Sequence, residues 1–289
     1  MSPRAMRPTT IGGRRFDWGE RTFVMGIVNV TPDSFSGDGL GGDGPDAVPA
    51  AVAQARRMAA EGADIVDVGG ESSRPGHKSV AEDEELRRVV PVVAAIARAL
   101  PGLPISIDTV KPAVASAALD AGASLLNDIW GVEPGHELVR IAAECGVPIV
   151  LMHNRAEPRY DDVVAEVGAD LRRAVEAAIE AGVPEPDIIV DPGFGFGKTA
   201  EHNLEMLRGL AALRSLGRPI LLGTSRKSTL GKVTDLPVAE RIEATLATTA
   251  LGIANGADIV RVHDVAANVR AARMADAVVR GWSEEVVPV

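Results

Sequence analysis

The sequence has little cysteine and few aromatic residues: one cysteine, Cys145, and 3% Phe, Trp and Tyr among 289 positions. A single cysteine excludes an intrachain disulfide and fits a reducing compartment. The sequence also lacks any apolar run near the ~20 residues that a membrane-spanning helix requires. Its first 22 residues are polar and basic, without the apolar segment of a secretory signal. These absences predict a cytoplasmic protein that does not span a membrane.

An excess of basic residues is also missing. Lys and Arg together number 30 and Asp and Glu 40, which gives a formal net charge of -10. Such a chain gains no counterion-release energy on a polynucleotide, so we expect no nucleic-acid partner. An anionic small molecule would instead need a local cluster of cations. Because 46% of the residues are hydrophobic but few are aromatic, we expect a core of many small aliphatic contacts.

Short apolar segments recur eight times along the chain, each rich in Ile, Val or Leu at both odd and even positions. Strands that are buried on both faces have this pattern, which is typical of parallel sheets. The predicted strands are Phe23–Val30, Asp64–Val68, Ile105–Asp108, Leu125–Ile129, Ile149–Met152, Ile188–Asp191, Ile220–Gly223 and Ile259–His263.

Helical segments lie between the predicted strands, and five of them end on a glycine just before the next strand. Glycine accepts the left-handed conformation that terminates a helix. Eight regular alternations of strand and helix predict a single (β/α)8 TIM barrel, with an open doubly wound sheet as the alternative. The clearest helices are Asp46–Glu61, Val80–Leu100, Val163–Ala181, Pro237–Asn255 and Ala266–Arg280, and the glycines are Gly62, Gly122, Gly146, Gly182 and Gly256.

No linker divides the chain, so we expect one barrel over residues 22–281, an N-terminal extension over 1–21 and a tail over 282–289. The glycine-rich segment Ser36–Gly44 follows the first strand and predicts a mobile loop there. The loop after the second strand is expected to be mobile as well. Ser79 and Glu82 form a candidate capping box for the second helix, and Glu82–Glu85 are expected to be a solvated first turn.

Every predicted strand carries polar side chains at its C-terminal end, which is where barrel enzymes carry their chemistry. For Asp108 or Asn127 alone, a satisfied buried hydrogen-bonding group is an equally good interpretation. For all eight ends together it is not, because buried polar groups cost free energy unless they are paired. The polar ends are Asn29, Glu71–Arg74, Asp108, Asn127–Asp128, His153, Asp191, Ser225–Lys227, Arg261 and His263.

The types of these residues point to a ligand with two chemical halves. Asp108, Asn127 and Asp191 supply carboxylate and amide groups that can pair with an aminopyrimidine-like ring. Cationic side chains suit a phosphate or diphosphate. A heterocycle that carries a diphosphate satisfies both halves. The cationic donors are Arg74, Arg226, Lys227, Arg261 and His263.

Two other residues, His153 and Cys145, also have side chains capable of chemistry. For His153, a structural role and a contact to the diphosphate are equally good interpretations. Cys145 ends an apolar helix before Gly146 and is expected to be a buried filler rather than a nucleophile. The remaining histidines are scattered and support no multi-histidine zinc site.

The strand-end motifs together resemble those of the dihydropteroate synthases, over about residues 22 to 280. The resemblance implies a transferase of folate biosynthesis, a target of sulfonamides, that joins a dihydropterin diphosphate to 4-aminobenzoate and releases diphosphate. It also implies a homodimer. The matching motifs are NVTPDSFS (Asn29–Ser36), GGESSRPG (Gly69–Gly76), SIDT (Ser106–Thr109), NDI (Asn127–Ile129), MH (Met152–His153), DPGFGFGK (Asp191–Lys198), SRKS (Ser225–Ser228) and RVHDV (Arg261–Val265).

The resemblance further implies a role for individual residues. Asn29 would bind the Mg²⁺ that accompanies the diphosphate, and Asp33 would support a cationic pterin. Asp33, Arg74 and Lys227 would be the catalytic residues. The pterin ring would be held by Asp108, Asn127, Asp191 and Lys227, the diphosphate by Arg261 and His263, and 4-aminobenzoate by Phe35, Arg74, Pro75, Phe196, Lys227 and Ser228. Ser73 and Val262 would be further substrate-binding residues.

Two rival functions remain at this level. A pterin-dependent methyltransferase domain would share the barrel and the pterin contacts, but it has no use for the RPG, TPDSF and SRKS motifs. A non-catalytic pterin-binding paralogue would keep Asp108, Asn127 and Asp191 without the loop residues. The sequence departs from the family pattern at Ser73, where Thr is more common, and in its long glycine-rich first loop.

Overall fold

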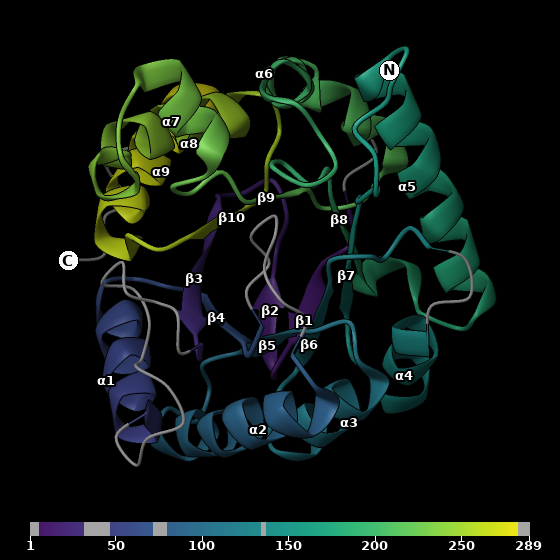
Figure 1. Cartoon of the computed structure of the whole chain (residues 1–289), viewed down its shortest axis with the longest axis vertical. Coiled ribbons are helices and arrows are strands. Elements are labelled where there is room, and N and C mark those ends of the chain that lie inside the picture. The colour runs from purple at the N-terminus through teal and green to yellow at the C-terminus, as the bar shows by residue number, and fades with distance from the viewer. Residues whose placement is uncertain (1–5, 32–46, 72–79, 134–136, 283–289) are drawn as a thin grey trace.

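The computed structural model describes residues 6–31, 47–71, 80–133 and 137–282. Eight parallel strands form a ring that is surrounded by helices (Figure 1). Their order around the ring is β8-β7-β6-β5-β4-β3-β10-β9. The strands are β3 (Phe23–Asn29), β4 (Ile65–Gly69), β5 (Ile105–Asp108), β6 (Leu125–Asp128), β7 (Ile149–Met152), β8 (Ile188–Asp191), β9 (Leu221–Leu222) and β10 (Ile259–Val262).

The ring closes between β8 and β9. An isolated parallel bridge joins Val190 to Ile220, and the Val190 amide donates to the carbonyl oxygen of Pro219 at 2.9 Å. The predicted barrel is therefore confirmed over the alternative of an open sheet. The last predicted strand before β10 is shorter than expected, since β9 comprises only Leu221–Leu222.

Helices cover the outside of the ring, and their apolar sides pack on the outward side chains of the strands. None of the helices in the described ranges is long and apolar enough to cross a membrane. The helices are α1 (Ala47–Ala60), α2 (Glu82–Ala99), α3 (Pro112–Asp120), α4 (Glu137–Cys145), α5 (Val163–Glu180), α6 (Ala200–Arg208), α7 (Ser228–Thr234), α8 (Ile242–Ala254) and α9 (Val265–Val279), with 3-10 turns η1 (Glu185–Asp187), η2 (Leu210–Leu216) and η3 (Val238–Glu240).

Two helix predictions need correction. The expected helix Pro237–Asn255 is divided into η3 and α8 at Arg241, whose guanidinium donates to the carbonyl oxygens of Leu236 and Arg226, each at 3.0 Å. The helix α2 begins at Glu82, and its N-cap is Ala81, which makes no side-chain cap bond. Ser79 lies outside the described residues, so the expected capping box has no counterpart at this N-cap.

The five predicted helix-ending glycines are confirmed. Each has a positive φ, between 64° and 115°, which is the left-handed conformation that glycine adopts at low cost. These are Gly62, Gly122, Gly146, Gly182 and Gly256.

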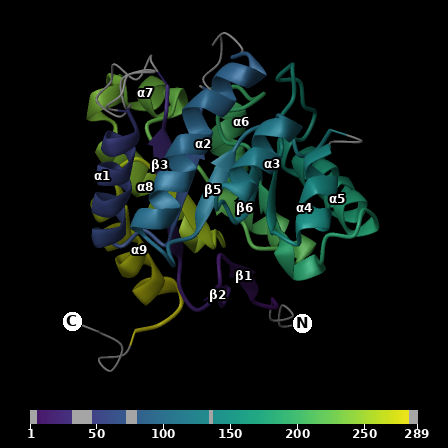
Figure 2. The same cartoon turned by 90° about the horizontal axis from the view of Figure 1, so that it is seen from below.

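An antiparallel hairpin of β1 (Thr9–Ile11) and β2 (Arg14–Phe16) lies below the barrel in Figure 2, at the end away from α7. The rings of Phe16, Trp18 and Phe23 contact one another there, with centroids 4.8 to 5.7 Å apart. Much of the small aromatic content therefore gathers in one place. The predicted extension covers the N-terminal end of the barrel, so access to the interior is left to the opposite end.

The interior of the barrel is layered because side chains alternate along each strand. Above the aromatic layer lies a ring of apolar side chains, contributed by Met25, Ile65, Leu125, Val150, Ile189, Leu221 and Ile259. Two residues further along several strands, the inward positions are polar. This second layer comprises Asp67, Asn127, Asp191 and Arg261, with Gly223 after β9.

Candidate active site

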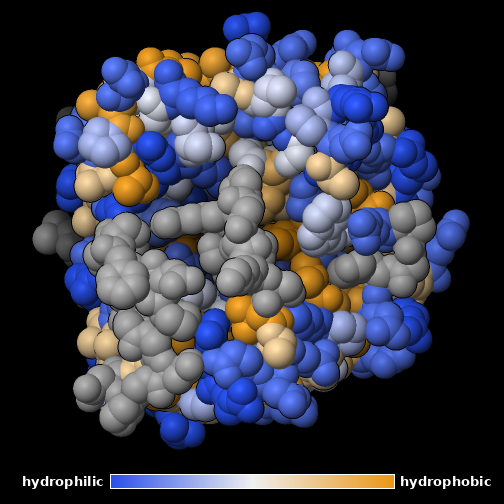
Figure 3. Space-filling view, in the orientation of Figure 1, coloured by the Kyte–Doolittle hydropathy of each residue, from blue (hydrophilic) through white to orange (hydrophobic). Residues whose placement is uncertain are grey.

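A pocket opens at the C-terminal ends of the strands, and six residues singled out from the sequence line it together. On the face seen in Figure 3, the described side chains are mostly hydrophilic around the periphery, and several apolar ones lie toward the middle. Ile129 and Met152 supply apolar surface. The full lining is Asp108, Asn127, Ile129, Met152, Asp191, Phe196, Gly223, Lys227 and Arg261.

The guanidinium of Arg261 bridges two carboxylates beneath the pocket. Its Nε lies 2.6 Å from Oδ2 of Asp67, and its Nη2 lies 2.7 Å from Oδ2 of Asp108. The Asn127 amide donates to the same Asp67 oxygen at 3.1 Å. Sequence reasoning missed Asp67, which is fully buried. The available signal was a carboxylate in the middle of an otherwise apolar strand, since burial without a partner would be costly.

Burial raises the pKa of Asp108 to about 7. The cation of Arg261 opposes this shift, whereas the neighbouring carboxylates of Asp67 and Glu85 add to it. The carboxyl therefore changes its protonation state close to neutral pH and can either accept or donate a hydrogen bond. A group of this kind is suited to a heterocycle edge that presents both N–H groups and bare nitrogens.

Asp191 and Lys227 also line the pocket, and their opposite charges interact. Oδ1 of Asp191 accepts from the Gly193 amide at 2.7 Å, and burial raises the pKa of this carboxyl. Burial lowers the pKa of Lys227 to about 8, with Asp191 opposing the shift. The Lys227 Nζ donates to the carbonyl of Phe194 and lies 4.4 Å from the centroid of the Phe196 ring. Lys227 thus connects the acidic floor to an aromatic wall.

His263 lies just beyond the end of β10, at the margin of the site. Its Nδ1 is 2.9 Å from the hydroxyl of Ser225. The neighbouring Arg226 is a predicted cationic donor of the phosphate subsite, and its guanidinium forms an ion pair with Asp264 at 2.7 Å. This charge is therefore largely compensated within the protein. Arg226 also has a positive φ of 57°, and its amide donates to Thr245.

The remaining predicted residues are distributed around the pocket's edge. Asn29 is the half-buried last residue of β3, and Ser228 is the exposed first residue of α7. The side chain of Val262 is buried in the core between sheet and helices, so only its backbone faces the site's margin. Asp33, Phe35, Ser73, Arg74 and Pro75, together with both loops expected to be mobile, lie outside the described residues.

Three minor predictions have clear outcomes. His153 is fully buried and held by Asp170 and Lys198, which settles the open question in favour of a structural role. Cys145 is exposed rather than buried, because it lies at the C-terminal end of α4. Glu85 does not belong to a solvated turn: it is 1% exposed and forms an ion pair with Lys111.

Comparison with known proteins shows which family this chain belongs to. The model for the pterin binding enzyme family matches residues 25–263. This chain belongs to that family. It is 50% identical to the dihydropteroate synthase of Clostridium beijerinckii over 93% of this chain and 99% of the relative, and 52% identical to that of Bacillus subtilis over 89% of each.

Solved structures of pterin binding enzymes match the fold as well. A Clostridium difficile dihydropteroate synthase, solved in the presence of pteroic acid, superposes with a TM-score of 0.87 at 47% identity, covering 92% of this chain and 99% of that one. A Xanthomonas albilineans dihydropteroate synthase with 4-aminobenzoic acid also has a TM-score of 0.87, at 42% identity, and the match covers 98% of this chain and 100% of that one. A complex of the Xanthomonas albilineans enzyme with 7,8-dihydropteroate has a TM-score of 0.84.

Proposed function

We infer that this chain catalyses dihydropteroate synthesis: it transfers the pterinylmethyl group of a dihydropterin diphosphate to the amino group of 4-aminobenzoate. The observation that carries this inference is the pocket of Asp108, Asn127, Asp191 and Lys227 at the strand ends of a chain about half identical to synthases. The reaction is a step of folate biosynthesis. A cytoplasmic location is proposed with it, supported by the single cysteine.

We propose that the acidic floor binds the pterin ring. The carboxylate of Asp191, already oriented by the Gly193 amide, would accept from the ring's amino group and an adjacent N–H. Asp108 and Asn127 would bind the opposite edge, with Asp108 able to adjust its proton to the ring nitrogen it meets. Ile129 and Met152 offer apolar contact to the ring faces.

The diphosphate is proposed to lie at the margin formed by Asn29, Arg261 and His263. Arg261 is held by Asp67 and Asp108, and the N–H groups that these bonds leave unused are the proposed donors. Among the described residues no group of three or more His, Cys, Asp or Glu side chains is placed to hold a metal ion. The Asn29 amide oxygen nevertheless fits Mg²⁺, because this ion commonly takes substrate phosphates and waters as its other ligands. When bound, the ion would neutralise charge on the leaving group.

We propose that the bond from the pterin methylene to the diphosphate oxygen breaks first, and that its electron pair leaves with diphosphate. The resulting cation is conjugated with the pterin ring, where the carboxylates of Asp108 and Asp191 would stabilise it. The neutral aniline nitrogen then adds to the methylene and releases a proton to solvent, so no covalent enzyme intermediate is expected. The proposed binding site for 4-aminobenzoate comprises Phe196, Lys227 and Ser228 together with Phe35, Ser73, Arg74 and Pro75. Asp33 would support the cation, and both Asp33 and Arg74 would act catalytically.

Release of diphosphate tests the proposed function directly. The purified chain is mixed with the dihydropterin diphosphate, 4-aminobenzoate and Mg²⁺, and diphosphate is measured by a coupled assay. We expect release that depends on both substrates and falls strongly when EDTA removes the metal. A chain that binds the pterin but releases no diphosphate with 4-aminobenzoate would be a pterin-binding paralogue instead.

We also propose a homodimer that forms through α8 and α9, which lie side by side in Figure 1. Leu251 on α8 and Met274 and Val278 on α9 are 55%, 66% and 73% exposed. These three side chains lie on two helices that pack against each other, and clusters of large exposed apolar side chains are typical of protein interfaces.

Analytical ultracentrifugation tests this dimer with charged variants. Changing Met274 and Val278 together to Glu is expected to convert a dimer into monomers, because burying two carboxylates in an apolar interface is costly. The Val233→Glu variant is the control, since Val233 is similarly exposed but lies on α7. A monomeric unmodified chain, or equal dissociation of the control, would contradict the proposal.

A further inference from the structure

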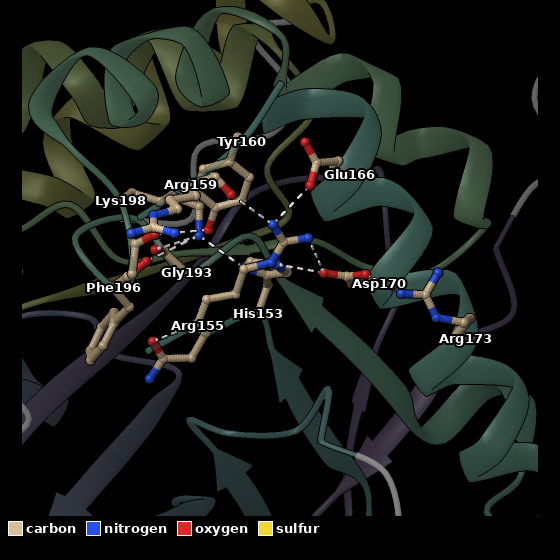
Figure 4. A network of polar contacts seen from close by, with 12 residues as sticks. His153, Arg155, Arg159, Tyr160, Glu166, Asp170, Arg173, Gly193, Phe196 and Lys198 are labelled. Carbon is tan, nitrogen blue, oxygen red and sulfur yellow. Dashed lines mark hydrogen bonds and ion pairs between the residues drawn. The ribbon is translucent and has the colours of Figure 1, made fainter. Parts of the chain in front are cut away.

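The loop Gly193–Lys198 follows β8 and is held on its outer side by a network of polar side chains (Figure 4). The network joins the end of β7, through His153 and Arg155, to α5, through Glu166 and Asp170. None of these four side chains lines the pocket. The network is therefore adjacent to the active site without being part of its surface.

Lys198 is the member of the network that belongs to the loop itself. Its Nζ lies 3.0 Å from Nδ1 of His153 and donates to the carbonyl oxygens of Gly193 and Phe196, each at 3.2 Å. These three acceptors match the three N–H groups of an ammonium. Burial lowers the pKa of Lys198 to about 7, and the carboxylate of Asp191 opposes this shift.

His153 passes the interaction on to α5. Burial and the nearby Lys198 lower the pKa of His153 to about 4, so the ring is neutral at pH 7. With Nδ1 accepting from Lys198, the single ring proton resides on Nε2 and is donated to Oδ2 of Asp170 at 3.0 Å. Arg155 donates to the same carboxylate oxygen at 2.8 Å and to Glu166 at 2.8 Å. Hydrogen bonds therefore run without a break from the loop, through the neutral His153, to the carboxylates of α5.

The loop is also packed tightly against the segment after β7. A Cβ atom at Gly193 would lie 1.8 Å from the carbonyl oxygen of His153, and one at Gly197 would lie 2.4 Å from that of Arg155. The hydroxyl of Tyr160 donates to the Gly197 carbonyl oxygen at 2.8 Å. Close approach of the two backbones leaves little room for the loop to shift while its polar contacts remain.

The inner side of the same loop contacts the site. The Gly193 amide orients Asp191, the Phe194 carbonyl accepts from Lys227, and the Phe196 ring lies against the Lys227 ammonium. A displacement of the loop would therefore move the aromatic wall and the end of Lys227 together. Asp191 itself is fixed mainly by its place at the end of β8, so the floor should move less.

We propose that Lys198 is a positioning residue which, through His153 and Asp170, fixes the Gly193–Lys198 loop and so the Phe196 and Lys227 side of the 4-aminobenzoate subsite. This rests on the proposed function, because it assigns that subsite to Phe196 and Lys227. Lys198 acts through the loop, since its three N–H groups already have acceptors within the protein.

The test compares Lys198→Met, which keeps the length of the side chain but removes its N–H groups, with Lys232→Met, which removes an exposed lysine from α7. We expect Lys198→Met to raise KM for 4-aminobenzoate by about tenfold or more and to lower kcat, because small misplacements of a reacting group are costly. Its Kd for the dihydropterin diphosphate should rise by a clearly smaller factor, because Asp108, Asn127 and Asp191 would keep their contacts to the pterin although Lys227 is displaced. Lys232→Met should match the unmodified chain.

Two further measurements keep the result decisive. Asp170→Asn removes only the charge at the far end of the network, and it should change KM in the same direction by a smaller factor. Hydrogen exchange of the Gly193–Lys198 amides should be faster in Lys198→Met than in the unmodified chain. Because this measurement needs no turnover, its outcome does not depend on the proposed function. Unchanged KM and unchanged exchange, or equal losses in KM and pterin Kd, would overturn the positioning role.

Discussion

Replacing Asp191 with alanine is expected to weaken binding of the dihydropterin diphosphate by about 100-fold or more. A hydrogen bond to a charged group contributes about 1.5–3 kcal/mol, and the proposed pairing of this carboxylate uses two of them. A loss of about 3 kcal/mol corresponds to roughly a 100-fold change in affinity. Isothermal titration calorimetry at constant Mg²⁺ measures the effect. Because the side chain is buried at the end of β8, no other carboxylate of that strand can replace it.

Asp187→Asn serves as the matched control for this variant. Asp187 lies in η1, immediately before the same strand, but at the opposite end of the barrel. The Asp187→Asn variant should bind the dihydropterin diphosphate with an affinity within about twofold of that of the unmodified chain. If Asp191→Ala also kept its affinity, the pterin ring would have to bind elsewhere.

Replacing Arg261 with methionine is expected to destabilise the folded chain by about 3–5 kcal/mol at pH 8. The change leaves Asp67 and Asp108 buried without their shared cation, and breaking a buried ion pair has a cost of this size. Urea unfolding monitored by circular dichroism measures the loss. Arg140→Met is the control, since Arg140 pairs with Glu137 on an exposed surface where such pairs contribute about 0–1 kcal/mol.

The same variant should show a distinctive dependence of stability on pH. The folded-state pKa of Asp108 is about 7 and its ordinary value is 3.8, so the folded chain binds the proton more tightly than the unfolded one. Stability from this group is therefore present below about pH 4 and is lost as pH rises through about 7. Arg261 lowers the pKa of Asp108, so its removal raises that pKa further. The loss of stability with rising pH then continues to a higher pH than in the unmodified chain. The penalty of Arg261→Met should accordingly be smaller at pH 5 than at pH 8; an equal penalty at both would show that Asp108 is not left uncompensated.

The sequence was sufficient to predict the architecture because the signals for it are local. Strands buried on both faces, helix-ending glycines and polar strand ends each leave a pattern within a few residues. The hairpin over the barrel was not predicted, since its three-residue strands pair only with each other and the contacts of Phe16 and Trp18 depend on the chain's return at Phe23. The division of the helix before α8 likewise depends on Arg241 reaching carbonyls outside that helix.

The linear pattern was enough to identify residues that take part in the site, since all six of these line one pocket: Asp108, Asn127, Asp191, Phe196, Lys227 and Arg261. The carboxylates that pair with each cation follow from the folded arrangement instead. Arg226 and Arg261 are both cations at strand ends, yet Arg226 is paired with Asp264 at the margin, whereas Arg261 bridges Asp67 and Asp108 inside the barrel. The same holds for His153, whose partners come from α5 and from the loop after β8. Partners that lie tens of residues apart are set by strand register and helix packing, and a linear pattern does not contain those distances.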